Sequence, residues 1–374
     1  MTFAVFDVGG SATSLGVVLG ASAVPALVFM LVGGVVGDRL ERRRILISTD
    51  LVMGVAQLVA ALLYFADSLT IPVLAALQFV RGIASSFFSP ASTGMMPSIV
   101  SRDKLQPANA LLGLARNAIG IVAPALAGAV IAIWSSGAAL GVDAASFFIS
   151  AAFVWLLPRS RGAVSVGSGI LQGVREGWSA FASRPWVWQM VLSFALYQAS
   201  VLPAIMLIGP LLADSSGLGA AGWAVILSAR AAGSLLAGVL LLRWRPRSPL
   251  VASTAVILLD IPFLIAIAAG ATLPVQAAAA AVSALGVVCA DTLWESTLQR
   301  RVPEDVLSRV SSYDWLGSLS MNPLGFVLIG AAAHSIGGVE VLLFVMGFHA
   351  LVRLALLLSP SLREGREDQV SAPT

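Results

Sequence analysis

Apolar runs of about 20 residues recur along almost the whole chain, separated by short polar segments. A run of this length is what one α-helix needs to cross the roughly 30 Å hydrocarbon core of a bilayer. Strands of a membrane β-barrel would instead alternate in hydropathy over about 10 residues. Only 11% of the residues are charged and 58% are hydrophobic, which argues against a soluble domain, where about 25% are charged. We therefore expect an all-α polytopic membrane protein.

Eleven of these runs are long enough to form transmembrane helices. They cover residues 15–36, 45–66, 69–89, 114–134, 138–157, 187–212, 221–242, 250–269, 273–294, 315–336 and 339–358. Arg and Lys cluster after the first, third, fifth, seventh, ninth and last of them, whereas the intervening loops contain none. Cytoplasmic loops retain basic residues, so this pattern predicts a cytoplasmic C-terminus.

Two pairs of similar segments divide the chain into halves. Residues 34–43 match 238–247 at an offset of 204, and residues 100–105 match 302–307 at an offset of 202. Two matches at nearly one offset indicate a parallel duplication. We expect an N-terminal helical bundle over 1–158, a cytoplasmic linker over 159–186, a six-helix bundle over 187–360 and a cytoplasmic tail over 361–374. In the linker, one helical face carries apolar residues and predicts an interfacial helix, formed by Ile170, Leu171, Val174, Trp178 and Phe181.

The first half has five full spans and the second has six. The predicted orientation requires another helix before the outer loop 7–14, and only residues 1–6 precede it. We therefore expect the chain to begin inside its first helix, through a misassigned start codon or a truncation, which gives 11 full helices and a remnant of the first.

Several motifs resemble those of one known family. The segment 34–43 resembles the signature loop of the major facilitator superfamily, with Glu41 where a glycine is usual. Its matching residues are Gly34, Gly37, Asp38, Arg39, Arg42 and Arg43. The run 78–91, with Gln78 and Arg81, resembles the fourth helix of the superfamily and its buried arginine.

Two further segments extend the resemblance. Gly120, Pro124 and Gly128 are similar to the antiporter motif of the fifth helix. The segment 294–309 is similar to the loop after the tenth helix in the transmembrane secretion effectors, which include the enterobactin exporter and macrolide efflux proteins. The resemblance implies the major facilitator fold, with two pseudo-symmetric helical bundles, a central cavity and alternating access.

The resemblance also implies roles for these residues. Asp38 and Arg42 would form a cytoplasmic gate that charge pairs hold closed, with Gly34 and Gly37 allowing close helix approach. The alternative for this segment is a basic anchor at the membrane surface. The motif around Pro124 would take part in conformational change, or would only bend or pack its helix.

Charges inside the membrane are costly and mark candidate coupling sites. Arg230 and Asp260 each lie nine residues from the outer end of their span, about 14 Å deep, so we expect them to pair. The pair is either structural or a protonation switch. Because the first helix is largely missing, Arg81 would lack the partner that this helix carries in the family.

Asp291 and Glu295 are four residues apart and share one helical face. Two neighbouring carboxylates favour uptake of a proton by one of them, whereas pairing with Arg300, Arg301 or Arg353 would make them structural. His349 lies near mid-membrane and is either hydrogen-bonded or a proton relay.

These observations favour a secondary active exporter of the bacterial plasma (inner) membrane, and not an enzyme. We expect it to be driven by protons and to move a bulky amphipathic small molecule, such as a drug, macrolide or siderophore. No ATP-binding loop or metal-ligand cluster occurs in the sequence, so no cofactor, metal or nucleic acid is expected. A monomer in the lipid bilayer is the simplest state. The alternatives are an importer of a small nutrient and a truncated remnant that does not transport.

Overall fold

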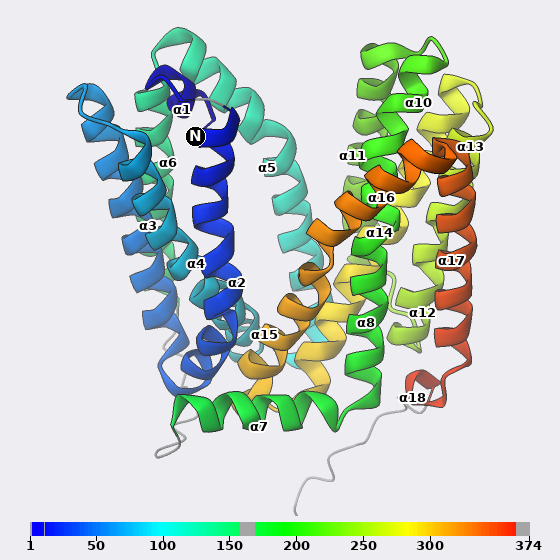
Figure 1. Ribbon diagram of the computed structural model, residues 1–374. Coiled ribbons are helices and arrows are strands. Elements are labelled where there is room, and N and C mark those ends of the chain that lie inside the picture. Colours follow the sequence, from blue (N-terminus) through cyan, green and yellow to red (C-terminus); the bar gives the residue numbers. More distant parts are fainter. Residues whose placement is uncertain (1, 11, 158–168, 364–374) are drawn as a thin grey trace, which may run out of the picture. The chain divides into compact units, whose positions relative to one another are not determined.

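The computed structural model describes residues 2–10, 12–157 and 169–363, and every element in this part of the chain is helical (Figure 1). Ten stretches of the described residues are long and apolar enough to cross a membrane. The eleventh expected span, 114–134, lies in α5 (Leu105–Ile133), several of whose side chains are outside the description. The all-α membrane fold agrees with the sequence.

The chain divides into two compact units, and neither is continuous in sequence. Unit 1 comprises Met1–Arg102, Gly120–Phe181 and Arg301–Leu316, and unit 2 comprises Asp103–Ile119, Ala182–Arg300 and Gly317–Thr374. The beginnings of α5 and α15 (Glu304–Ser320) are therefore exchanged relative to the halves expected from the repeat. Both helices begin within the matching segments 100–105 and 302–307, so the exchange is itself repeated. The bundle boundaries derived from the sequence stay a prediction.

Unit 1 is built from long helices that pack side by side. Helix α2 packs along α4, and α3 packs against both α4 and α6. The short α1 adds the fully buried Ala4 and Val5 to an apolar cluster that also contains Leu74 and Leu140. The helices of this unit that lie outside α5 and α15 are α1 (Thr2–Asp7), α2 (Ala12–Arg39), α3 (Arg42–Phe65), α4 (Ile71–Ile99), α6 (Ser136–Leu156) and most of α7 (Ile170–Ala182).

Unit 2 contains spans interrupted at prolines. The expected span 250–269 forms as α12 (Pro249–Val256), the 3₁₀ turn η3 (Ile257–Leu259) and α13 (Asp260–Ala268). Pro262 has no N–H for the carbonyl of Leu258, which favours this local tightening of the helix. The other elements are α8 (Pro185–Ala199), α9 (Val201–Pro203), the π-helical η2 (Ala204–Ile208), α10 (Gly209–Ser215), α11 (Gly219–Leu241), α14 (Leu273–Arg301), α16 (Asn322–Ile336), α17 (Gly338–Leu358) and α18 (Pro360–Arg363).

Two helices begin earlier than their apolar runs. The run 315–336 was expected to start a span, but α15 begins at Glu304, and the run 114–134 belongs to a helix that begins at Leu105. A hydropathy window finds the part of a helix that suits the bilayer core and misses the polar turns that continue it. Arg309 therefore lies on a helix and not in a loop as expected. The short 3₁₀ turn η1 (Arg102–Lys104) precedes α5.

The linker contains the expected helix, α7. Its buried side consists of Gly173, Gly177 and Phe181, and the two glycines approach α2 and α15 closely. Leu171 and Trp178 stay exposed and leave an apolar surface of the kind that an interfacial helix needs. The position of this helix at the membrane stays a prediction, and residues 158–168 of the expected linker lie outside the described residues.

Candidate functional site

The signature segment 34–43 is almost entirely helical. Helix α2 ends at Arg39 and α3 begins at Arg42, so only Leu40 and Glu41 separate them. The expected loop is therefore a tight corner, and the four-residue spacing of Asp38 and Arg42 brings their side chains together there. Both side chains are buried, at 1% and 2% exposure.

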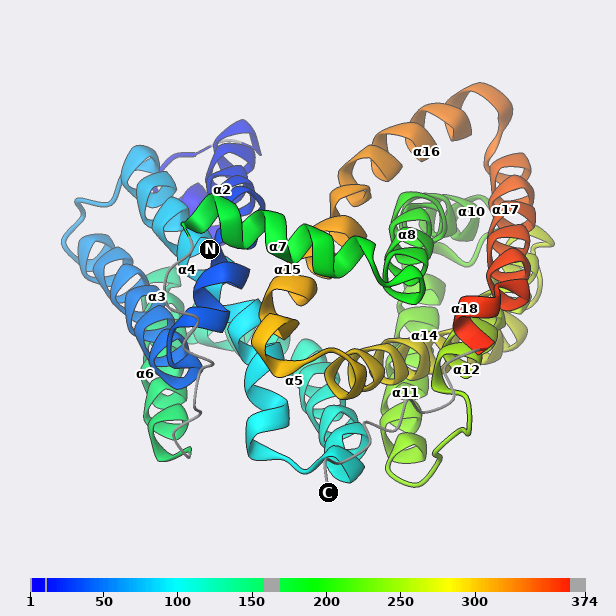
Figure 2. The ribbon, with the colours of Figure 1, turned by 90° about the horizontal axis from the view of Figure 1, so that it is seen from below.

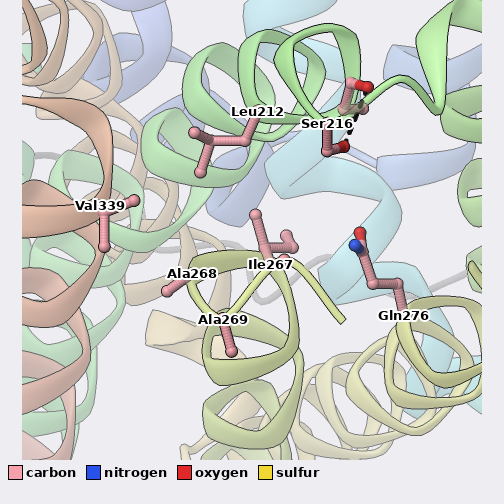
Figure 3. Close-up of a pocket in the computed structure, with 9 residues that line it drawn as sticks. Leu212, Ser216, Ile267, Ala268, Ala269, Gln276 and Val339 are labelled. Carbon is pink, nitrogen blue, oxygen red and sulfur yellow. Dashed lines mark hydrogen bonds between the residues drawn. The ribbon is translucent and has the colours of Figure 1, made fainter. Parts of the chain in front are cut away.

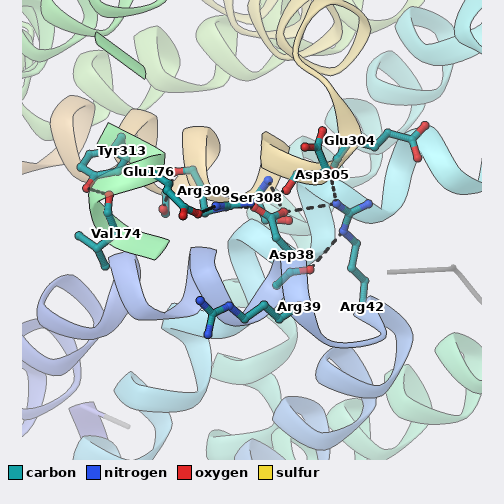
Figure 4. A network of polar contacts seen from close by, with 12 residues as sticks. Asp38, Arg39, Arg42, Val174, Glu176, Glu304, Asp305, Ser308, Arg309 and Tyr313 are labelled. Carbon is teal, nitrogen blue, oxygen red and sulfur yellow. Dashed lines mark hydrogen bonds and ion pairs between the residues drawn. The ribbon is translucent and has the colours of Figure 1, made fainter. Parts of the chain in front are cut away.

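Asp38 is the centre of a buried polar network in unit 1 (Figure 4). Its Oδ1 accepts hydrogen bonds from the backbone N–H of Ser308 at 3.0 Å and from Arg42 Nη2 at 3.4 Å. Its Oδ2 accepts from Arg309 Nε at 2.8 Å and from the backbone N–H of Arg309 at 3.2 Å. Four donors, two of them cationic, offset the cost of removing this carboxylate from water.

Arg309 uses the rest of its guanidinium group on two further partners. Its Nη1 donates to Glu176 Oε2 of α7 at 2.9 Å, and its Nη2 donates to the carbonyl of Asp305 at 2.8 Å. From the sequence, Arg309 was expected only as a basic loop residue at the end of the segment 294–309, and Glu176 was not singled out. The expected partner of Asp38 was Arg42, yet Arg309 makes the shorter contact.

Arg42 is held mainly by backbone carbonyls. Its Nη1 donates to the Gly94 carbonyl of α4 at 2.7 Å, and its Nη2 donates to the Glu304 carbonyl at 2.5 Å. The basic-anchor alternative applies better to the neighbouring arginines. Arg44 is 81% exposed beside Glu41, and Arg43 donates to the carbonyl of Trp155 and lies over its ring.

Glycines allow the helices of this network to approach closely. A Cβ on Gly34 would lie 2.8 Å from Cβ of Ser312 and 2.9 Å from the Ser308 carbonyl oxygen. A Cβ on Gly94 would lie 2.6 Å from Oγ of Ser308. Gly37 has more room, with Ser308 Cβ at 3.1 Å. Arg39 reaches outward and donates to the Gly169 carbonyl at 3.1 Å.

Arg81 has partners, contrary to the expectation from the sequence. Its Nη1 lies 3.3 Å from Gln78 Oε1 and 4.0 Å from Asp143 Oδ2, and its guanidinium group lies over the Phe147 ring. Gln57 also donates to Asp143. Helix α6 instead supplies a carboxylate for Arg81.

The antiporter-like motif lies on α5, which runs unbroken from Leu105 to Ile133. The side chains at positions 120, 124 and 128 are outside the described residues. The roles expected for Gly120, Pro124 and Gly128 therefore stay predictions.

In unit 2, a serine connects the two membrane charges that were expected to pair. Arg230 Nη1 donates to Ser283 Oγ at 2.8 Å, and Ser283 Oγ donates to Asp260 Oδ1. Asp260 is fully buried, whereas Arg230 is partly buried and lies over the Phe263 ring. The chain Arg230–Ser283–Asp260 thus joins α11, α14 and α13.

Other polar groups surround Asp260. Tyr197 and Arg353 are within electrostatic range of its carboxylate. Arg353 donates to the hydroxyl of Ser193 at 2.8 Å. His349 Nε2 lies 3.2 Å from the Ile257 carbonyl, with its ring against Tyr197. This buried, hydrogen-bonded histidine fits the structural alternative better than the relay.

The acids of α14 occupy different surroundings. Asp291 is exposed, whereas Glu295 is partly buried and accepts a hydrogen bond from Gln299 at 3.5 Å. Arg116 of α5 attracts Glu295 electrostatically, a basic partner that was not considered from the sequence. The shared helical face therefore does not give the two carboxylates a shared environment.

A cavity of about 360 Å³ lies near the ends of α10 and α13 in unit 2 (Figure 3). Leu212, Ser216, Ile267, Gln276 and Val339 contribute to its lining. The amide nitrogen of Gln276 already donates to the Ala271 carbonyl at 2.7 Å. None of the candidate residues from the sequence lines this cavity, so we assign no role to it.

Known proteins resemble this chain over most of its length. The sequence profile of the Major Facilitator Superfamily matches residues 1–325. The uncharacterized MFS-type transporter YfiS of Bacillus subtilis is 27% identical, over 98% of this chain and 89% of its own length.

Several relatives have names that describe efflux or export. The enterobactin exporter EntS of Citrobacter koseri is 24% identical over 98% of this chain and 86% of its own length. Macrolide efflux protein A of Streptococcus pyogenes is 24% identical over 52% of this chain and 49% of its own length.

The fold is also found among solved structures. The human organic anion transporter MFSD10 matches 96% of this chain and 88% of its own, with a TM-score of 0.74 at 16% identity. At this identity the likeness shows the fold alone.

Proposed function

The chain belongs to the major facilitator superfamily, and we propose that it is a proton-coupled exporter of a bulky amphipathic small molecule. Membership confirms the family resemblance of the motifs and makes the chain a multi-pass membrane transporter with small-molecule substrates. The named relatives that support export are the macrolide efflux protein and the enterobactin exporter. A drug, a macrolide or a siderophore fits this class of substrate.

The coupling site is assigned to Asp260. Protonation of this buried carboxylate removes its charge, and Ser283 carries that change to Arg230 through one hydroxyl group. A guanidinium group released in this way becomes available to an anionic or polar group of the substrate. The chain Arg230–Ser283–Asp260 is the single structural observation that carries the coupling proposal.

The gate is assigned to the network around Asp38. Its closed state is held by Arg42 and Arg309, which lie on α3 and α15. The basic loops support a bacterial plasma membrane protein with a cytoplasmic C-terminus, and they favour a position of this network at the cytoplasmic end. The transporter acts as a monomer.

Accumulation in cells tests the export proposal. Cells expressing the chain are loaded with a dye, a macrolide or a catecholate siderophore, with and without a protonophore. Expression lowers accumulation of at least one compound, and the protonophore abolishes this decrease. If accumulation of every compound stays unchanged, export by this chain is rejected.

A matched pair of variants tests the coupling residue. Asp260→Asn keeps the shape of the side chain but cannot be charged, and it abolishes protonophore-sensitive export. Asp50→Asn is the control, because Asp50 is also buried and also accepts a hydrogen bond from a serine of a neighbouring helix, Ser150, at 2.7 Å. Equal loss in the two variants would refute a special role of Asp260.

A further inference from the structure

The linker helix α7 contacts the gate network through a charged side chain. Glu176 Oε2 accepts from Arg309 Nη1 at 2.9 Å, while Arg309 Nε holds Asp38 at 2.8 Å. One guanidinium group therefore joins α7 to α2. Glu176 is also fixed on its own helix, because Gln172 donates to its Oε1 at 3.1 Å.

Helix α7 fits closely against α2 and α15. It lies crosswise at the lower ends of both helices in Figure 1, and Figure 2 views it from that side. A Cβ on Gly177 would lie 3.1 Å from both Arg309 Cβ and Tyr313 Cε2, and a Cβ on Gly173 would lie 2.6 Å from Val35 Cγ1. The Tyr313 hydroxyl donates to the carbonyl of Val174 at 2.8 Å. This close fit fixes the position of α7, and it thereby fixes the distance between Glu176 and Arg309.

The rings of Tyr313, Trp178 and Phe181 complete this contact. The Tyr313 ring lies 5.6 Å from each of the other two. Aromatic pairs at such separations stabilise a packed interface. Helix α7 is therefore held on α15 by packing and on Arg309 by charge.

Glu176 balances the charges of the ion pairs that the structure describes in this network. Two guanidinium groups, of Arg42 and Arg309, face the carboxylates of Asp38 and Glu176. Without Glu176, a single buried carboxylate faces two buried cations. An uncompensated charge in buried surroundings destabilises the arrangement that contains it.

We propose that α7 is a working part of the gate and that Glu176 is a positioning residue, which keeps Arg309 on Asp38 in the closed network. The inference rests on the proposed gating role of Asp38. In this proposal, the linker takes part in gating in addition to connecting the two sequence halves. Opening of the network separates Glu176 from Arg309 or moves α7 together with α15.

Alkylation of a cysteine in the network tests the inference without any transport substrate. In the full-length chain, Cys289→Ala removes the single cysteine, which is buried. Ser308→Cys then places a thiol beside Asp38, at a position with 0% exposure. N-ethylmaleimide reacts with this thiol in membranes at a rate that reports opening of the network.

Three changes are compared in this background. Glu176→Gln keeps the size of the side chain and raises the alkylation rate about two- to fivefold, the range for a half-exposed ion pair. Glu176→Asp keeps the charge and stays nearer to the parent rate. Arg175→Gln changes an exposed charge on the same helix and leaves the rate unchanged.

Asp38→Asn separates this inference from the gating proposal. If Asp38→Asn raises the rate and Glu176→Gln does not, the gate stands and the role of α7 is overturned. If neither variant raises the rate, the gating proposal itself fails. A rise for Glu176→Gln that Arg175→Gln reproduces would show a general effect of charge on α7 and would also overturn the inference.

Discussion

At the scale of single residues, burial separates arginines that look alike in the sequence. Arg42, Arg43 and Arg44 are consecutive, yet Arg42 is 2% exposed and Arg44 is 81% exposed. A buried guanidinium group must have its donors satisfied, whereas an exposed one is solvated by water. Of these three arginines, only Arg42 therefore belongs to the network around Asp38.

Removal of Arg309 should destabilise the protein more than removal of an exposed arginine. Arg309→Gln leaves Asp38 buried with one cationic partner fewer, and we expect the unfolding free energy to fall by about 2–4 kcal/mol. Arg44→Gln removes only an exposed pair and should cost less than about 1 kcal/mol. Thermal unfolding in detergent compares the two, and equal losses would contradict the account.

Substitution of Ser283 should uncouple transport while leaving the fold intact. Ser283→Ala removes the hydroxyl between Arg230 and Asp260, and we expect protonophore-sensitive export to fall about tenfold or more, the effect of losing a positioned proton-transfer group. Ser253→Ala is the control, because Ser253 is equally buried and donates to a backbone carbonyl, that of Ala290. Similar export by both variants would argue against a coupling role of the Ser283 hydroxyl.

At the scale of helices, the apolar runs predicted the spans well because the bilayer demands a continuous apolar surface. The same runs could not predict where polar turns extend a helix, as at Glu304 of α15. The rise of a helix per residue predicted that Arg230 and Asp260 lie at a similar depth. It could not predict that Ser283 lies between them, because an uncharged serine on a third helix does not stand out in an apolar span. Apart from Arg42, the partners of Asp38 are Ser308 and Arg309, which lie 270 and 271 positions beyond it and came only from the structure.

The repeat relates two helix junctions, and Asp38 makes the one in unit 1 ionic. Ser308 and Gln106 occupy matching positions at the offset of 202. Ser308 donates its backbone N–H to Asp38, whereas Gln106 donates its side chain to the carbonyls of Leu241 and Trp244. At the offset of 204, Leu242 stands where Asp38 does. The contacts of Gln106 that the structure describes at the junction in unit 2 are therefore hydrogen bonds to backbone carbonyls.

Close helix approach at Gly34 should be essential for the ionic junction. Gly34→Ala puts a methyl group against the Ser308 carbonyl and Ser312, so we expect lower stability and loss of export. Gly141→Ala on α6 meets no atom within 4 Å and should be neutral or stabilising by up to about 1 kcal/mol, the helix preference of Ala over Gly. Thermal unfolding and export of the two variants decide this, and an unaffected Gly34→Ala protein would contradict the close-packing argument.

At the scale of the whole molecule, each sequence half contributes the beginning of one helix to the other unit. Segment 301–316 supplies Arg309 to Asp38, and segment 103–119 supplies Asn109, which donates to Ser296 and Gln299. The sequence could not predict this exchange, because the repeat predicts two continuous halves. It gives the two halves direct polar contacts in addition to the linker.

The central claim is that Asp260 couples export to protons. The most direct measurement is proton movement in proteoliposomes that contain the purified chain, on addition of a macrolide or a catecholate siderophore. We expect the compound to drive protons across the membrane with the parent protein and not with Asp260→Asn, while Asp50→Asn behaves like the parent. Transport of the compound without proton movement, or unchanged proton movement with Asp260→Asn, would contradict the account.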